Sequence, residues 1–149
     1  KVRKSIFDSL GPLNHLAVLD IFSGSGILGF ESSSRGASSV TFVENNPKIF
    51  NLLRQNVLSF PGQNFFLKKK DAIKYLKTSE TFDLIIADPP YNYFNQNTKI
   101  DVDLFIEMML KKIPLNGRFV LECSKELPIK FPIKTKIFGE TKVCMGENR

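Results

Sequence analysis

The chain has 149 residues, which is enough for one domain and too few for two domains of ordinary size. Hydrophobic residues make up 42% and charged residues 24%, which are globular values that exclude a disordered or collagen-like chain. No apolar run approaches the roughly 18 residues of a spanning helix, and no secretory signal opens the chain. With two cysteines and one histidine, a disulfide scaffold or a histidine-rich metal site is excluded, so we expect a cytoplasmic protein without a metal.

Basic residues exceed acidic ones by 21 to 15, which gives a net charge of +6. A basic surface favours polyanions, nucleic acid first and an anionic membrane second, although charge alone is equally consistent with a role in solubility. The basic residues form small clusters, none of which is long enough for a disordered arm: Lys1, Arg3 and Lys4; Lys68, Lys69 and Lys70; Lys111 and Lys112; Lys130, Lys134 and Lys136.

Short apolar runs alternate with helical patterns along the chain. Strands are predicted over residues 16–21, 39–44, 64–68, 82–87 and 118–123. Helices are predicted over residues 27–35, from Asn46-Pro47 to Pro61-Gly62, over residues 71–77 with Asp71 as cap, and from Asp101 to Lys112. Residues 134–138 and 141–145 predict a terminal hairpin. The order predicts an α/β fold with a mostly parallel seven-stranded sheet, helices on both faces and an antiparallel strand from the hairpin.

A glycine-rich segment follows the first predicted strand. Gly24, Gly26 and Gly29 match the pattern G-x-G-x-x-G, and Glu44 ends the second strand. Such glycines let the backbone approach a ligand closely, and a carboxylate at the end of the second strand can bind a ribose diol. The simpler alternative is a tight turn without a ligand.

The residue before the glycines bears on which nucleotide would bind. Asp20 ends the first strand, where a carboxylate would repel a pyrophosphate but could pair with the ammonium of a methionine moiety. This favours S-adenosylmethionine over a dinucleotide.

A second motif, Asp88-Pro89-Pro90-Tyr91, follows the fourth predicted strand. The prolines stiffen the backbone and lack N–H groups, so the segment offers only acceptors beside an aromatic ring. Asp88 and the Pro89 carbonyl could accept hydrogens from an exocyclic amine while Tyr91 stacks on the base. A sulfonium methyl is already electrophilic, so orienting the nitrogen would supply most of the catalysis. The alternative is a turn in which the prolines only end the strand.

These residues resemble the Rossmann-like S-adenosylmethionine-dependent methyltransferases and, within them, the RsmD family of bacterial 16S ribosomal RNA (guanine-N2) methyltransferases. The resemblance covers nearly the whole chain and implies a doubly wound fold. The most family-specific stretches are Ser34-Arg35-Gly36-Ala37 and the tail over residues 138–143, and the similarity also includes residues 2–10, 19–29, 40–44, Glu31 and Asn56.

The resemblance also implies roles for individual residues. The cofactor would contact Asp20, Phe22, Gly24, Ser25, Gly26, Glu44, Asn45, Asp71 and Ala72. The catalytic residues would be Asp88, Pro89, Pro90 and Tyr91, and the flipped-out guanine would contact Tyr91, Tyr93 and Phe94 in the loop over residues 91–97. Packing over the loop is an equally weighted alternative for Tyr93 and Phe94. The lysine clusters would hold phosphates without reading sequence.

Two departures from the family pattern stand out. Lys4 replaces the glutamate that usually follows Arg3, and the N-terminal arm of the family does not precede the chain. We expect residues 1–149 to form a single methyltransferase domain that acts as a monomer on 16S ribosomal RNA or the small ribosomal subunit.

Four other functions compete with this interpretation. An adenine-N6 methyltransferase of DNA or RNA also uses Asp-Pro-Pro-Tyr, although 149 residues leave no room for a DNA target-recognition region. Glutamine-N5 methyltransferases typically have Asn where Asp88 stands. An NAD-dependent oxidoreductase would need a proton donor that the sequence does not show. An inactive RNA-binding module is disfavoured by the intact Asp88.

Overall fold

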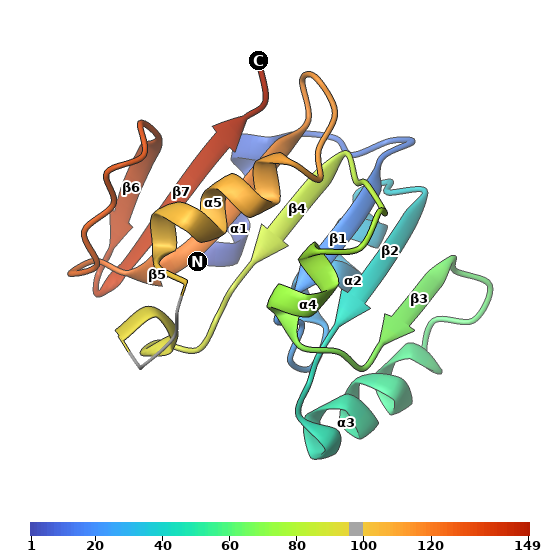
Figure 1. The fold of residues 1–149 in the computed structure, drawn as a ribbon. Helices are drawn as coiled ribbons and strands as arrows, with labels where there is room; N and C mark the ends of the chain where they lie inside the picture. The colour runs from blue at the N-terminus through green and yellow to red at the C-terminus, as the bar shows by residue number, and fades with distance from the viewer. Residues whose placement is uncertain (96–99) are drawn as a thin grey trace.

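Seven strands form one mixed sheet in the computed structural model, which describes residues 1–95 and 100–149 (Figure 1). Across the sheet the strands lie in the order β3-β2-β1-β4-β5-β7-β6, and β7 runs in the opposite direction to the other six strands. The strands are β1 (Ala17–Ile21), β2 (Ser39–Val43), β3 (Phe65–Lys68), β4 (Leu84–Ala87), β5 (Arg118–Ser124), β6 (Lys134–Phe138) and β7 (Thr141–Glu147). This confirms the doubly wound, Rossmann-like α/β fold with a terminal hairpin.

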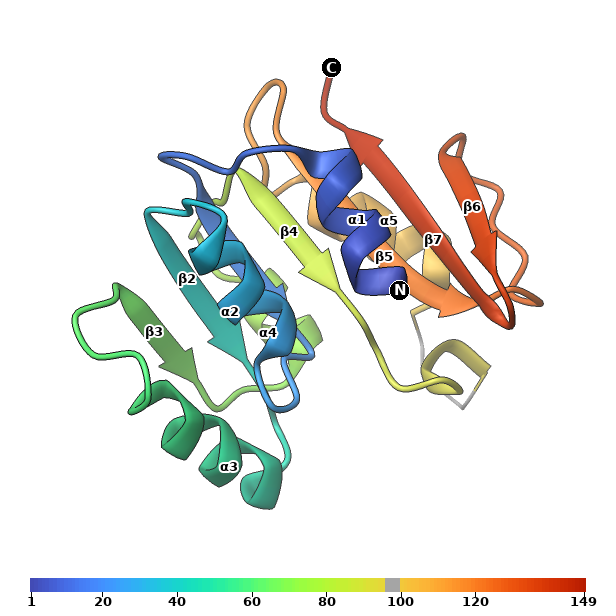
Figure 2. The same cartoon turned by 180° about the vertical axis from the view of Figure 1, so that it is seen from behind.

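Helices cover both faces of the sheet, as Figures 1 and 2 show. The side chains of α1, α2 and α3 pack on one face with Val18, Leu84 and Val120, and those of α4 and α5 pack on the other with Leu19 and Ile85. The helices are α1 (Val2–Leu10), α2 (Ile27–Ser34), α3 (Pro47–Val57), α4 (Ala72–Leu76) and α5 (Val102–Leu110), with a short 3-10 helix η1 (Tyr93–Asn95) before α5. Within the described ranges, no helix is long and apolar enough to cross a bilayer.

The capping residues expected from the sequence hold three helices. Asn46 accepts bonds from the amides of Lys48 and Ile49 at the start of α3, and Asp71 and Asp101 cap α4 and α5 in the same way. The predicted end of α3 at Pro61-Gly62 is wrong, because the α-helix ends at Val57. After the helix, the backbone amides of residues 58–60 each donate a hydrogen bond to the carbonyl three residues earlier. The chain there therefore forms a tighter, 3-10-like turn.

The helix α1 is the element that only the family resemblance implied. Its residues Ile6, Phe7 and Leu10 are buried against the sheet. Arg35 joins it to α2, since the guanidinium pairs with Glu31 at 2.9 Å and Asp8 at 3.7 Å and lies 5.4 Å from the centre of the Phe7 ring. Lys4, the departure from the family pattern, bonds to Asp8 on the exposed side.

Close packing of α2 on the sheet depends on Gly29. A Cβ atom at this position would lie 2.2 Å from the ring of Phe42, which is fully buried on β2. The third glycine of the motif therefore serves helix–strand packing.

Gly29→Ala is expected to destabilise the fold by about 1–3 kcal/mol, because the buried Phe42 ring must move to accept the methyl group. Urea unfolding at equilibrium measures the change. Ser34→Ala, at an exposed position near the end of the same helix, is the control and should change stability by less than about 0.5 kcal/mol. Equal stability of Gly29→Ala and the unmodified chain would contradict the packing argument.

Candidate active site

The carboxyl ends of β1, β2 and β4 meet where the strand order reverses, which is where ligands bind in open α/β sheets. Two hollows lie there, and Phe22 lines both. One, of about 410 Å³, is also lined by Glu44, Asn45, Asn46, Lys70, Asp71, Ala72, Pro90 and Tyr93. The other, of about 590 Å³, is also lined by Lys1, Arg3, Ser23, Gly24, Ser25, Asp88 and Glu122. The structure thus gathers the two sequence motifs around one crevice.

The glycine loop takes backbone conformations that side chains disfavour. Gly24 and Gly26 have φ of +58° and +96°, and Phe22 has φ of +63° although it is not glycine. An aromatic residue in this region is strained, and such strain is characteristic of functional sites. The Phe22 ring packs on Tyr93 at 4.9 Å and on Phe105 at 5.9 Å, between ring centres. The loop backbone is therefore open to a ligand while the ring fixes its position.

Glu44 ties the glycine loop to the segment after β2. One carboxylate oxygen accepts the Gly24 amide and the other accepts the Asn46 amide, both at 2.9 Å. From α3, the Asn56 side chain donates to the Ser25 carbonyl at 3.0 Å. Each carboxylate oxygen can accept more than one hydrogen, so Glu44 still offers acceptors to a ribose diol. Its role in cofactor binding remains a prediction.

Asp20 lies beneath the loop rather than at its surface. The side chain is 1% exposed and accepts the Gly29 amide at 3.0 Å. Burial first, and then the nearby charges of Asp88 and Glu44, raise its pKa well above the usual range, whereas the bond from Gly29 opposes this. These contacts make Asp20 a support for the loop, and its pairing with a methionine ammonium remains a prediction.

The segments after β2 and β3 supply the far wall of the crevice. Asn45 is exposed there, and Ala72 is buried next to Asp71. One carboxylate oxygen of Asp71 accepts a hydrogen bond from the Lys74 amide at 3.1 Å. The sequence predicted all three as neighbours of an adenine, and the structure places them together on one wall. Contact with an adenine remains a prediction.

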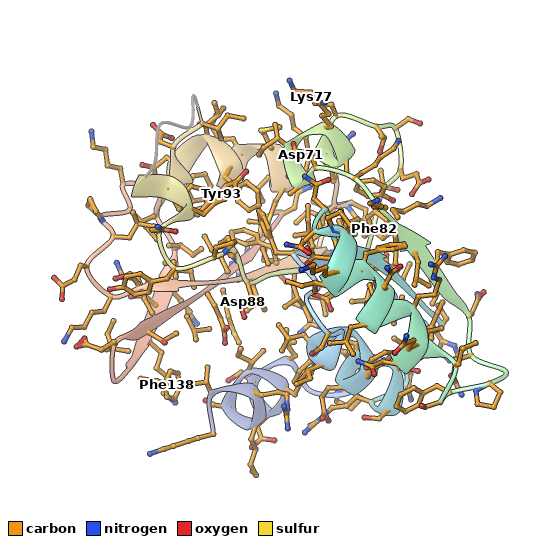
Figure 3. All side chains as sticks on the ribbon, turned by 90° about the horizontal axis from the view of Figure 1, so that it is seen from below. Asp71, Lys77, Phe82, Asp88, Tyr93 and Phe138 are labelled. Atoms are coloured by element: carbon orange, nitrogen blue, oxygen red, sulfur yellow. The ribbon has the colours of Figure 1, made fainter. Side chains whose placement is uncertain are left out.

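The acceptor-rich motif leaves β4 beside the glycine loop. Figure 3 gives the view from below that of Figure 1. In it, α1 and α2 lie on one side of Asp88, and Tyr93 and Asp71 lie on the opposite side. Asp88 is exposed, and Pro90 accepts the Tyr93 amide at 2.9 Å, which closes the turn. Tyr91 is 70% exposed, and its hydroxyl accepts from Ser124 at 3.2 Å. The ring of Tyr91 is therefore available to a base.

The other two predicted substrate residues are packed. The Tyr93 ring contacts Phe22, and the Phe94 ring contacts Phe105 at 5.5 Å between centres. Burial raises the pKa of Tyr93, and the charge of Asp71 adds to this effect. This favours the packing interpretation for Phe94, whereas Tyr93 also lines the crevice. The predicted loop extends to residues 96 and 97, which lie outside the described residues.

Glu122 is a site residue that the sequence interpretation missed. Ala87 pairs with Leu121 in the parallel ladder, so the next residues, Asp88 and Glu122, lie side by side. The two carboxyl groups lie close enough to interact directly, so a hydrogen bond between them requires one of the two to carry a proton. Burial first, and then the charge of Asp88, raise the pKa of Glu122 to about 8. The pKa of Asp88 is also raised, because its carboxyl group, although open to the crevice, is partly desolvated by the surrounding protein. The signal available in the sequence was a lone acid in an otherwise apolar central strand.

No set of three or more His, Cys, Asp or Glu side chains is arranged to hold a metal ion in the part of the chain that the structure describes. The carboxyl groups around the glycine loop instead bond to backbone amides or to one another.

Comparison with known proteins identifies the family. The family described as Conserved hypothetical protein 95 matches residues 1–146. The chain belongs to this family. A curated relative, ribosomal RNA small subunit methyltransferase D of Haemophilus influenzae, is 33% identical over 99 residues, which cover 62% of this chain and 51% of the relative. The matched region thus spans about half the length of this relative.

Two further similarities extend over the whole chain. The putative rRNA methyltransferase YlbH of Bacillus subtilis is 30% identical over 100% of this chain and 85% of its own length. A 16S rRNA N2 methyltransferase of Thermus thermophilus, solved in complex with AdoMet and guanosine, matches 98% of this chain and 41% of that one, with a TM-score of 0.78 and 22% identity. At 22% identity, the latter similarity shows a shared fold alone.

The paired carboxyl groups predict a pH-dependent stability. The pKa of Glu122 in the folded chain lies above its usual 4.5, so the folded state keeps a proton that the unfolded chain releases. The free energy of unfolding should therefore fall as the pH rises from about 4.5 to about 8. Glu122→Gln cannot titrate at this position and should lose less stability over that window. Urea unfolding at pH 5 and pH 8.5 measures both chains, and parallel pH curves would contradict the assignment.

Proposed function

We propose that this protein transfers a methyl group from S-adenosylmethionine to the exocyclic N2 amine of a guanine in 16S ribosomal RNA. The observation that carries the proposal is the position of Asp88-Pro89-Pro90-Tyr91 beside the glycine loop, in the same crevice. One motif is suited to an adenosyl ligand, and the other to a planar amine that must meet it.

The residues of the crevice fit S-adenosylmethionine. Asn45, Asp71 and Ala72 would contact the adenine, and Glu44 the ribose, in the smaller hollow. Phe22, Gly24, Ser25 and Gly26 would line the methionine part toward the other hollow, with Asp20 beneath them. The carboxyl groups of Asp20, Glu44, Asp88 and Glu122 surround the loop, and each of them that is ionised would favour a sulfonium cation electrostatically.

The acceptor corner would orient the amine for attack. When bound, S-adenosylmethionine supplies a methyl group on a positively charged sulfur. Asp88 and the Pro89 carbonyl would accept the two amine hydrogens and aim the nitrogen lone pair at the methyl carbon. As the N–C bond forms and the C–S bond breaks, the pair of electrons goes to sulfur. The amine then loses a proton, which the carboxyl pair of Asp88 and Glu122 is placed to accept.

The relatives and the charge support ribosomal RNA as the substrate. Relatives over part and over all of the chain are named as ribosomal RNA methyltransferases, and the net charge is +6. A guanine in a duplex cannot present its amine to the crevice, so the target must be unpaired or flipped out. Exposed Tyr91 could stack on it, and lysines outside the crevice could bind phosphates. On this proposal the protein acts as a monomer in the cytoplasm, where small subunits assemble.

The decisive experiment is to incubate the protein with labelled S-adenosylmethionine and small ribosomal subunits from cells that lack the enzyme, and to map the labelled nucleotide. Label on guanine N2 of 16S ribosomal RNA is the expected result. Label on adenine, or no label despite tight binding of the cofactor, would contradict the proposal.

Asp88→Ala should lower the rate of methyl transfer by at least 100-fold, because the amine loses its charged acceptor. Rate losses of this order occur when a reacting group is misplaced. Cofactor affinity should stay within a few fold, which isothermal titration calorimetry measures. Glu107→Ala, at an exposed position on α5 away from the crevice, is the control and should retain activity. Loss of cofactor binding in Asp88→Ala would show that Asp88 acts on the cofactor instead.

A further inference from the structure

Glu122 faces the same crevice as Asp88 because of the sheet register. Side chains alternate between the two faces of a strand, and Val120 of β5 and Ile86 of β4 both pack on the face covered by α1 and α2. Glu122 lies two residues after Val120, and Asp88 lies two residues after Ile86, so both side chains point to that same face. Both therefore reach the hollow that the glycine loop lines.

The surrounding protein does not account for an acid at this position. Neither Glu122 nor Asp88 forms a salt bridge among the described residues, and Arg3, which lines the same hollow, pairs with Glu31 at 3.9 Å. Placing two carboxyl groups side by side without a salt-bridge partner costs free energy, because like charges repel and Glu122 is half-buried. An arrangement of this kind in a crevice indicates a ligand that interacts with both groups.

A guanine presents a matching pair of groups. Its N2 amine and its N1–H are adjacent donors that point in nearly the same direction, and the two carboxyl groups are adjacent acceptors on neighbouring strands once Glu122 gives up its proton. Adenine also carries an exocyclic amine, but the neighbouring ring nitrogen is an acceptor. A carboxylate beside Asp88 would therefore attract guanine and repel the adenine edge.

We propose that Glu122 is a substrate-recognition residue that accepts the N1–H of the guanine whose N2 amine Asp88 binds. This inference rests on the proposed function and adds the determinant that selects guanine. The raised pKa of Glu122 is consistent with it, because a proton held between Glu122 and Asp88 would occupy the place that the donors of the base take.

The test compares guanosine with a nucleoside that keeps its N2 amine but has no hydrogen on N1. 2-Aminopurine riboside has the N2 amine of guanosine, but its N1 is an acceptor. The full chain is saturated with S-adenosylhomocysteine, and calorimetry measures the affinities for guanosine, 2-aminopurine riboside and adenosine. The unmodified protein should prefer guanosine over 2-aminopurine riboside by about tenfold or more, the value of a hydrogen bond to a charged acceptor.

Glu122→Ala should bring this preference to within about twofold, and Glu122→Gln, which keeps a neutral acceptor oxygen, should reduce it less. Glu107→Gln, at the exposed position on α5, should leave it unchanged. Retained affinity for S-adenosylhomocysteine shows that a variant is folded. An undiminished preference in the folded Glu122→Ala variant overturns the inference and leaves the proposed function standing. Absence of any preference in the unmodified protein overturns it whatever the variants do. Failure to bind S-adenosylhomocysteine, or equal affinity for adenosine, counts against the proposed function itself.

Discussion

Two carboxylates that accept backbone amides hold the glycine loop, and the site depends on these bonds. Glu44, which directly follows β2, accepts the Gly24 amide, and Asp20 of β1 accepts the amide of Gly29 in α2. Both bonds are at least partly buried, where a hydrogen bond is stronger than it is in water. They connect the loop to two adjacent strands, so the start of α2 and the floor of the crevice are fixed before a ligand enters. The absence of a side chain at Gly29 allows the helix to lie close enough for this arrangement.

The charge distribution separates two tasks. The chain as a whole is basic, with lysines spread over its surface, yet carboxyl groups surround the glycine loop. A positive exterior attracts a polyanion at long range, whereas the interior of the crevice favours cationic and hydrogen-donating groups. A nucleic acid would therefore be drawn to the surface by its phosphates, and only a group with exposed donors would be favoured inside.

Most of the architecture could be predicted from the sequence because local signals agree with it. Apolar runs mark the central strands, Asn46, Asp71 and Asp101 mark three helix starts, and the two motifs follow strands that the topology places side by side. Glu122 could not be assigned in this way. Its position depends on the pairing of β5 with β4, which no local pattern specifies. Likewise, the burial of Asp20 and the packing of Phe94 on Phe105 depend on distant elements.

The strand β6 forms one edge of the sheet, and its residues from Lys134 to Ile137 are all exposed. Lys134 and Lys136 alternate along it, and the Lys136 ammonium lies 5.2 Å from the centre of the Phe138 ring. An open strand has unpaired backbone groups that can recruit further strands, and lysines along it make such stacking unfavourable. The rim of the sheet is thus protected against growth into intermolecular β-structure by like-charge repulsion, without a helix to cover it.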